Sequence, residues 1–190
     1  MRHSTIFLAV LVTASRAHAS FTVVKGIDNW NAAVPTSTTI DFNLGSSQFV
    51  SNQYESLGVM FPDAEEWAYA FDGFQIDGWG CKGALDGDAD IHLKFLQPQY
   101  AVGAWFPGKL FAKLYWQGEL IYSSQSLDSA PLTYDFGGIV STQPFDEVVL
   151  WDSDGFVFVD DIKFSSTVPA PGAAVILLAG ALRGRGRRRA

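Results

Sequence analysis

The chain has 190 residues, of which 48% are hydrophobic, and this length suits one domain with a sizeable core. Its single cysteine, Cys81, excludes an intrachain disulfide, so a packed core or a bound ion must stabilise the domain. Between residues 20 and 168, six lysines face 20 acidic residues, and this charge of −14 argues against nucleic acid and anionic lipid as partners, because both require a basic surface.

The N-terminal segment, residues 1–19, has the form of a signal peptide. A short basic start precedes an apolar run over residues 6–12. Ala17 and Ala19 then form the small-residue pattern that signal peptidase cleaves, which would leave Ser20 as the first mature residue. A core helix is the alternative, but the apolar run is short and its flanks favour export.

The next stretch predicts short strands separated by turns. Residues 21–25 form the first predicted strand, and Asp28 or Asn29 then caps a short helix that carries Trp30 inward and ends at Pro35. Further elements predicted in this stretch are strands at 38–42 and 59–61 and a helical turn at 52–58 with a glycine stop.

Three aspartates alternate with other residues at the end of an irregular, glycine-rich stretch over residues 62–90. Asp86, Asp88 and Asp90 resemble the start of a calcium loop, in which a hard cation offsets the repulsion between carboxylates. The EF-hand pattern does not continue, because Ile91 stands at its glycine position and Gln97 at its glutamate position. A structural calcium ion is therefore the one candidate cofactor, and plain Asp-Gly turn chemistry is the alternative.

Aromatic side chains in or beside loops are the candidates for carbohydrate stacking. Binding a sugar ring requires an exposed aromatic face with polar groups around it, whereas the same residue types are more often half-buried core. The candidates are Trp67, Tyr69, Trp79 and Trp116.

The rest of the domain predicts regularly spaced strands, and no segment of ten or more residues shows a helical period. The predicted strands cover 90–95, 100–106, 110–116, 119–124 and 132–136, with Gln117-Gly118 as a tight hairpin link. Many short strands separated by Gly and Pro turns predict a single antiparallel all-β sandwich over residues 20–167. His92 is the one histidine of this region, and its parity is opposite to the apolar residues around it, so we expect a surface position and no catalytic triad.

The stretch from Phe145 to Phe164 predicts a hairpin with its turn at residues 152–155. Its second strand poses a parity problem, because regular alternation places Asp160 on the core face, where a carboxylate must be hydrogen-bonded or bound to an ion. A bulge at Asp160-Asp161 is the alternative, and it turns Val157, Val159, Ile162 and Phe164 inward instead. We expect a structural role for Asp160, either as an acceptor of backbone N–H groups or at an ion near the first strands.

The C-terminal segment, residues 168–190, has three parts. Val168, Pro169, Ala170 and Pro171 precede an apolar run over 172–182, and a cluster of arginines follows that includes Arg187, Arg188 and Arg189. This order resembles a PEP-CTERM sorting signal, with Ala170 in place of the usual glutamate. The resemblance implies export, arrest in the inner membrane by the basic tail, and processing by an exosortase. A solvated basic tail is the alternative.

The domain itself resembles secreted bacterial β-sandwich domains that carry such tails. In that family an early strand ends in Asp-Phe, as Asp41-Phe42 does, and Tyr54 and Gly58 follow at matching places. The last strand, residues 159–164, matches the family's closing pattern. The resemblance implies a jelly-roll sandwich similar to galactose-binding-like modules, flanked by a signal peptide and a short hydrophobic sorting helix, and it implies no activity.

Together these features predict an exported, non-enzymatic protein of the cell surface or of an exopolysaccharide-rich extracellular matrix. The alternative is a carbohydrate-binding module that recognises an exopolysaccharide, and the third hypothesis is an enzyme similar to glycoside hydrolases. Signal peptidase and an exosortase are the expected processing enzymes, and the C-terminal segment is expected to contact the inner membrane transiently. The metal ligands expected, if calcium binds, are Asp86, Asp88, Asp90 and Asp160.

Overall fold

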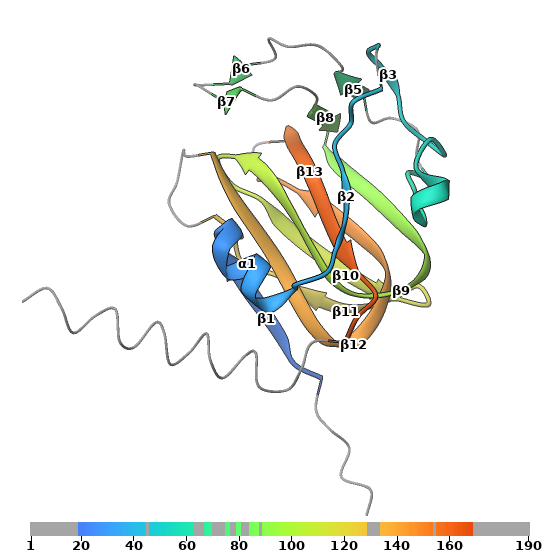
Figure 1. Cartoon of the computed structure of the whole chain (residues 1–190), viewed down its shortest axis with the longest axis vertical. Coiled ribbons are helices and arrows are strands. Elements are labelled where there is room, and N and C mark those ends of the chain that lie inside the picture. The colour runs from blue at the N-terminus through green and yellow to red at the C-terminus, as the bar shows by residue number, and fades with distance from the viewer. Residues whose placement is uncertain are drawn as a thin grey trace, which may run out of the picture.

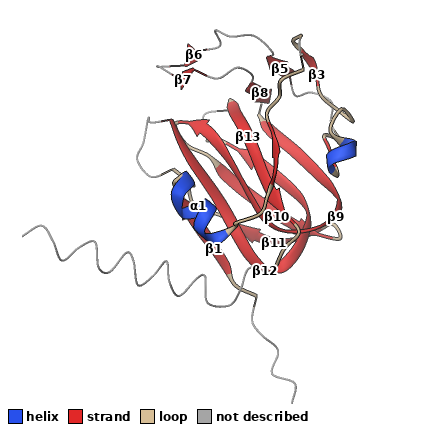
Figure 2. Ribbon diagram, in the orientation of Figure 1, coloured by secondary structure: helices blue, strands red, loops and turns tan. Residues whose placement is uncertain are grey.

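The computed structural model describes residues 19–44, 46–62, 67–69, 75–76, 79–80, 84–87, 89–128, 134–153 and 155–168. Within these residues the chain is almost wholly β, with one α-helix, α1 (Ile27–Ala33), and one 3-10 turn, η1 (Glu55–Leu57) (Figure 2). Every strand pair is antiparallel, which confirms the predicted all-β class. In the part of the chain so described, no helix has the length and apolar character needed to cross a membrane.

Two long strands, β9 (Asp90–Pro107) and β12 (Tyr134–Trp151), form the frame of the molecule. The first half of β12 pairs with the second half of β9, and the second half of β12 pairs with the first half of β9. Register shifts between Val140 and Glu147 separate these two pairings, and both strands bend (Figure 1). Each strand therefore contributes one arm to each of two layers.

The first layer, which we call layer 1, has the order β1-β12-β9-β13-β2. It contains β1 (Phe21–Lys25), β2 (Thr38–Ile40) and β13 (Val157–Ser165) beside the first arm of β12 and the second arm of β9. Layer 2 has the order β11-β10-β12-β9-β4, with β4 (Val59–Met60), β10 (Phe111–Trp116) and β11 (Glu119–Ser123).

Short strands extend layer 1 beyond the start of β13. They are β8 (Ala84–Gly87), β5 (Trp67–Tyr69) and β3 (Gln48–Phe49), and β6 (Gln75–Ile76) and β7 (Trp79–Gly80) form a separate two-stranded sheet. Four of these short strands, β5 to β8, lie within the glycine-rich stretch over residues 62–90.

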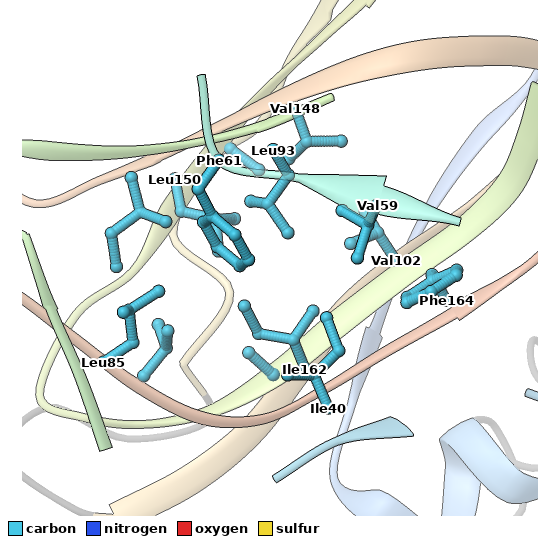
Figure 3. Packing of buried hydrophobic residues seen from close by; sticks show 14 of the residues in the cluster. Ile40, Val59, Phe61, Leu85, Leu93, Val102, Val148, Leu150, Ile162 and Phe164 are labelled. Carbon is cyan, nitrogen blue, oxygen red and sulfur yellow. The ribbon is translucent and has the colours of Figure 1, made fainter. Parts of the chain in front are cut away.

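The main core lies between the inward faces of the two layers (Figure 3). Alternation with a period of two supplies it: Leu93 and Val148 face inward from layer 2, and Val102 and Phe164 face them from layer 1. Ring contacts reinforce the packing, because Phe95 lies 6.0 Å from Phe145 and 5.0 Å from Phe164 between ring centroids.

Helix α1 covers part of the outer face of layer 1. Trp30 is fully buried there and meets the ring of Phe136 edge-on at 5.3 Å. It lies directly over Gly138, where an added Cβ would come within 2.6 Å of the indole ring. The inward placement of Trp30 confirms the prediction, but the capping prediction was wrong: the helix begins after Gly26 without a side-chain cap, and Asn29 donates to the carbonyl of Lys25 at 2.7 Å.

The predicted closing hairpin is wrong in its pairing. Strands β12 and β13 are not neighbours, because β9 lies between them and pairs with both. The turn that follows Trp151 carries the chain from layer 2 to layer 1 instead of folding it back beside itself. The strands predicted at 90–95 and 100–106 are also one continuous strand, β9, and the strand predicted at 132–136 begins the same strand that ends at Trp151.

Candidate functional site

The outer face of layer 2 carries aromatic and polar side chains on neighbouring strands. In β10, Ala112 and Leu114 are buried in the core, so Phe111, Lys113 and Tyr115 project outward between them. Residues directly opposite one another in antiparallel strands project to the same side, and the register therefore extends this face across β12 and β9.

An aromatic stack lies at one end of this face. Phe111 is the register partner of Trp151, and their rings stack with centroids 4.6 Å apart and an interplanar angle of 22°. The amine Nζ of Lys113 lies 5.5 Å from the centre of the Trp151 ring, within the range of a cation–π contact. All three side chains are partly exposed.

Hydrogen-bonding groups surround the stack. Asp90 is opposite Trp151 on β9, and its Oδ1 lies 3.5 Å from Nε2 of His92. Farther along the same face, Glu147 is opposite Lys94 on one side and Tyr115 on the other. We call this surface the aromatic face; its residues are Asp90, His92, Lys94, Phe111, Lys113, Tyr115, Glu147 and Trp151.

Such a surface has the chemistry needed to bind a sugar chain. Aromatic ring faces accept the apolar C–H side of a pyranose, and carboxylate, amine and imidazole groups exchange hydrogen bonds with its hydroxyls. His92 lies on β9 and is partly exposed, at the surface position that the sequence predicts.

The four aromatic residues predicted from the sequence to bind carbohydrate are not among the residues that define the aromatic face. Trp116 is partly exposed at the end of β10, next to the aromatic face, and is the register partner of Glu119. The side chains of Trp67, Tyr69 and Trp79 lie outside the described residues. Phe111 and Trp151 were not among the residues predicted from the sequence, although the alternation of 111, 113 and 115 with two small or aliphatic residues was a usable signal.

A second group of side chains surrounds the bulge in β13. The alternation shifts at Asp161, which has a φ of 46°, and Val157, Val159, Ile162 and Phe164 all face the core. The bulge that the sequence left as an alternative is therefore correct. It frees Asp160 from the core face and places it opposite Trp105.

Asp160 is nevertheless only 8% exposed. Its Oδ1 accepts one hydrogen bond, from the N–H of Asp161 at 2.7 Å. Burial raises the pKa of Asp160 to about 7; the Asp161 N–H lowers that pKa, and the charges of Asp161 and Asp41 raise it. The expected structural role as an acceptor of backbone N–H groups is thus present, with a single donor.

Tyr54 lies near this carboxylate. Its hydroxyl is buried and has no hydrogen-bond partner among the described residues. Burial raises the pKa of Tyr54, and the charges of Asp41 and Asp160 raise it further, so the phenol is within electrostatic reach of both carboxylates.

The four predicted metal ligands are not all in one layer. Asp86 is on β8 opposite Phe158, whereas Asp90 belongs to layer 2 and Asp160 to layer 1. Asp88 lies outside the described residues. Among the residues that are described, no group of three or more His, Cys, Asp or Glu side chains is arranged to hold a metal ion. Calcium binding stays a prediction.

No protein-family model and no curated protein matches the chain. Some solved structures overlap with it distantly. A mutant of the family 29 carbohydrate-binding module CBM29-2 overlaps with a TM-score of 0.39 at 13% identity, over 70% of this chain and 92% of that one. A structure described as carbohydrate-binding module family 29 overlaps at 0.33 and 12% identity, over 80% and 92% of the two chains. A CBM29-2 mutant complexed with mannohexaose does so at 0.33 and 12%, over 80% and 95%. Overlaps this weak assign the chain neither a family nor a ligand.

Proposed function

We propose that the protein is an exported, non-catalytic module that binds polysaccharide through the aromatic face, as a component of the cell surface or extracellular matrix. The observation that supports this function best is the stack of Phe111 on Trp151, with Lys113 against the same indole ring. Because each ring is held by its stacking partner, both side chains are already ordered, and a sugar chain binds them at little cost in side-chain entropy.

The charge of the chain favours a neutral polysaccharide. With −14 between residues 20 and 168, a polyanion such as a uronic acid polymer is repelled over the whole surface. The aromatic face itself carries two lysines and two carboxylates, which balance each other locally. Binding to a neutral chain depends on stacking and hydrogen bonds and should therefore change little with ionic strength.

Export and sorting belong to the same proposal and rest on the sequence. Signal peptidase would remove residues 1–19, and an exosortase would process the tail while its apolar run is held in the inner membrane. In this proposal the sandwich adopts jelly-roll connectivity, and the processed domain remains at the cell surface or in the matrix.

Affinity electrophoresis tests the proposal directly. The purified protein is run through gels containing hydroxyethylcellulose, galactomannan or alginate, and we expect retardation by at least one neutral polymer and none by alginate. Marked weakening of that retardation in Trp151→Ala but not in Phe49→Ala supports the assignment, because Phe49 is an exposed phenylalanine on β3, outside the aromatic face. Migration unaffected by every neutral polymer, including the host's own exopolysaccharide, would overturn it.

A further inference from the structure

A second aromatic stack lies on the opposite side of the molecule, on the outer face of layer 1. Trp105 and Tyr134 come from neighbouring strands β9 and β12, and their rings stack at 4.8 Å with an interplanar angle of 19°. Trp105 also meets Phe136 edge-on at 5.6 Å, and this contact anchors the stack to the cluster under α1. Tyr134 extends beyond that cluster and is 41% exposed.

A carboxylate with too few partners lies beside this stack. Asp160 is opposite Trp105 and so projects to the same side of the sheet. It is 8% exposed, and the N–H of Asp161 is its only hydrogen-bond donor among the described residues. A nearly buried carboxylate needs more than one donor, and two adjacent sugar hydroxyls would supply them.

The hydroxyl of Tyr54 is a second buried polar group that lacks a partner among the described residues. More than nine-tenths of the residue is buried against Phe42 and Phe61, and the hydroxyl has no partner among the described residues. Orphaned polar groups of this kind are uncommon in folded proteins and call for a partner.

We propose that Trp105, Tyr134 and Asp160 form a second polysaccharide subsite, which makes the protein a bivalent cross-linker of matrix chains. This inference rests on the proposed function, since it assigns the same ligand class to a second surface. The two stacks lie on the outward faces of two layers packed back to back about 10 Å apart, so two polymer chains bind without touching. Two weak sites on one rigid module give an avidity that neither has alone.

Light scattering separates binding from cross-linking. The purified protein is titrated into the neutral polymer that retards it most strongly, and we expect polymer clusters to grow with wild-type protein. Tyr134→Ala removes an exposed ring, and Asp160→Asn keeps the shape of the side chain but removes its charge. Both variants should still be retarded in the gel, because the aromatic face is intact. The increase in scattering should be at least tenfold smaller for each of them than for the wild type. Trp151→Ala should likewise retain weak retardation and lose cross-linking, and the Trp151/Tyr134 double variant should lose both.

The outcomes distinguish the two proposals. Failure of the wild-type protein to bind any polymer overturns the proposed function and this inference together. The second subsite alone is overturned if the wild-type protein is retarded but Tyr134→Ala and Asp160→Asn scatter as strongly as the wild type. Melting curves of each variant by circular dichroism show that the fold is intact, so that a loss of scattering reports the site.

Discussion

Asp160 lies directly opposite Trp105 across β13 and β9, one residue before the bulge at which Asp161 adopts a φ of 46°. The bulge lets Val159 and Ile162 both face the core, although they are three positions apart in the chain and regular alternation would place them on opposite faces. As a result an aspartate in an otherwise apolar strand lies outside the main core and beside an indole ring, with one backbone donor.

The contribution of Asp160 to stability should therefore decrease as pH rises from about 4 to about 7. Burial raises the pKa of Asp160 from its ordinary value of 3.8 to about 7, so the folded protein binds this proton more tightly than the unfolded chain. The stabilisation is fully present below about pH 4 and is lost as pH rises through about 7. Asp160→Asn should be more stable than wild type at pH 8 by about 1–3 kcal/mol and nearly equal to it at pH 4.

Urea unfolding at the two pH values measures this difference. Glu119→Gln, an exposed substitution on β11, is the matched control and should show the pH dependence of the wild type. The expected direction would be contradicted if the wild type gained stability relative to Asp160→Asn between pH 4 and pH 8.

Gly138→Ala should destabilise the fold. An added Cβ would lie 2.6 Å from the fully buried ring of Trp30 and 2.7 Å from the backbone carbonyl oxygen of Val102 in β9. We expect a loss of about 1–3 kcal/mol in the free energy of unfolding. Gly108→Asn is the control, because Gly108 has a φ of 74° and open space around it, and asparagine tolerates this conformation. Equal melting temperatures for the two variants would show that α1 is not held against Gly138.

Phe111→Ala and Trp151→Ala should each weaken polysaccharide binding about tenfold or more, which corresponds to about 1.4 kcal/mol or more. Because the two rings stack on each other, the double variant should lose less than the sum of the single losses. Isothermal titration with the retarding polymer measures all three. Additive losses would mean that the rings act separately, and a loss as large in Phe49→Ala would remove the aromatic face as the site.

Protein recovered from its native host should begin at Ser20 and lack the terminal arginines. Signal peptidase would cut after Ala19, and exosortase processing would remove the Arg187–Arg189 cluster together with the apolar run. Intact-mass spectrometry of the surface and secreted fractions reads both ends at once. Full-length protein found in the cytoplasm contradicts export, whereas a mature N-terminus with an intact C-terminus contradicts only the sorting step.

Calcium should stabilise the protein if Asp86, Asp88 and Asp90 bind it. Calcium at a hundred times its dissociation constant would add about 2.7 kcal/mol by mass action, and a chelator should lower the melting temperature. Asp88→Asn should abolish the difference. Identical melting curves in calcium and in chelator leave these aspartates as turn residues.

The sequence alone was sufficient to predict the class of fold, because the alternation of polar and apolar residues is a local property. It places Phe111 and Lys113 on the opposite side of a strand from Ala112 and Leu114, and the structure agrees. It also predicts the hairpin link at Gln117-Gly118, where both residues have positive φ as such two-residue turns require.

Only the tertiary structure decided which strands are neighbours. The runs that end at Trp151 and begin at Val157 are close in sequence and look like a hairpin, but β9, from the middle of the chain, lies between them. Pairing between distant segments depends on the packing of the whole core, and no local pattern encodes it.

The candidate site depends on the same long-range register. Phe111 and Trp151 are 40 residues apart in sequence, and they stack because β10 and β12 pair with these two residues opposite each other. The sequence identified residue types suited to sugar binding, but it predicted the site in or beside loops, where single aromatic residues are easy to recognise. The aromatic face requires several strands in register. The register of β9, β10 and β12 is set by the side chains that interdigitate in the core beneath this face.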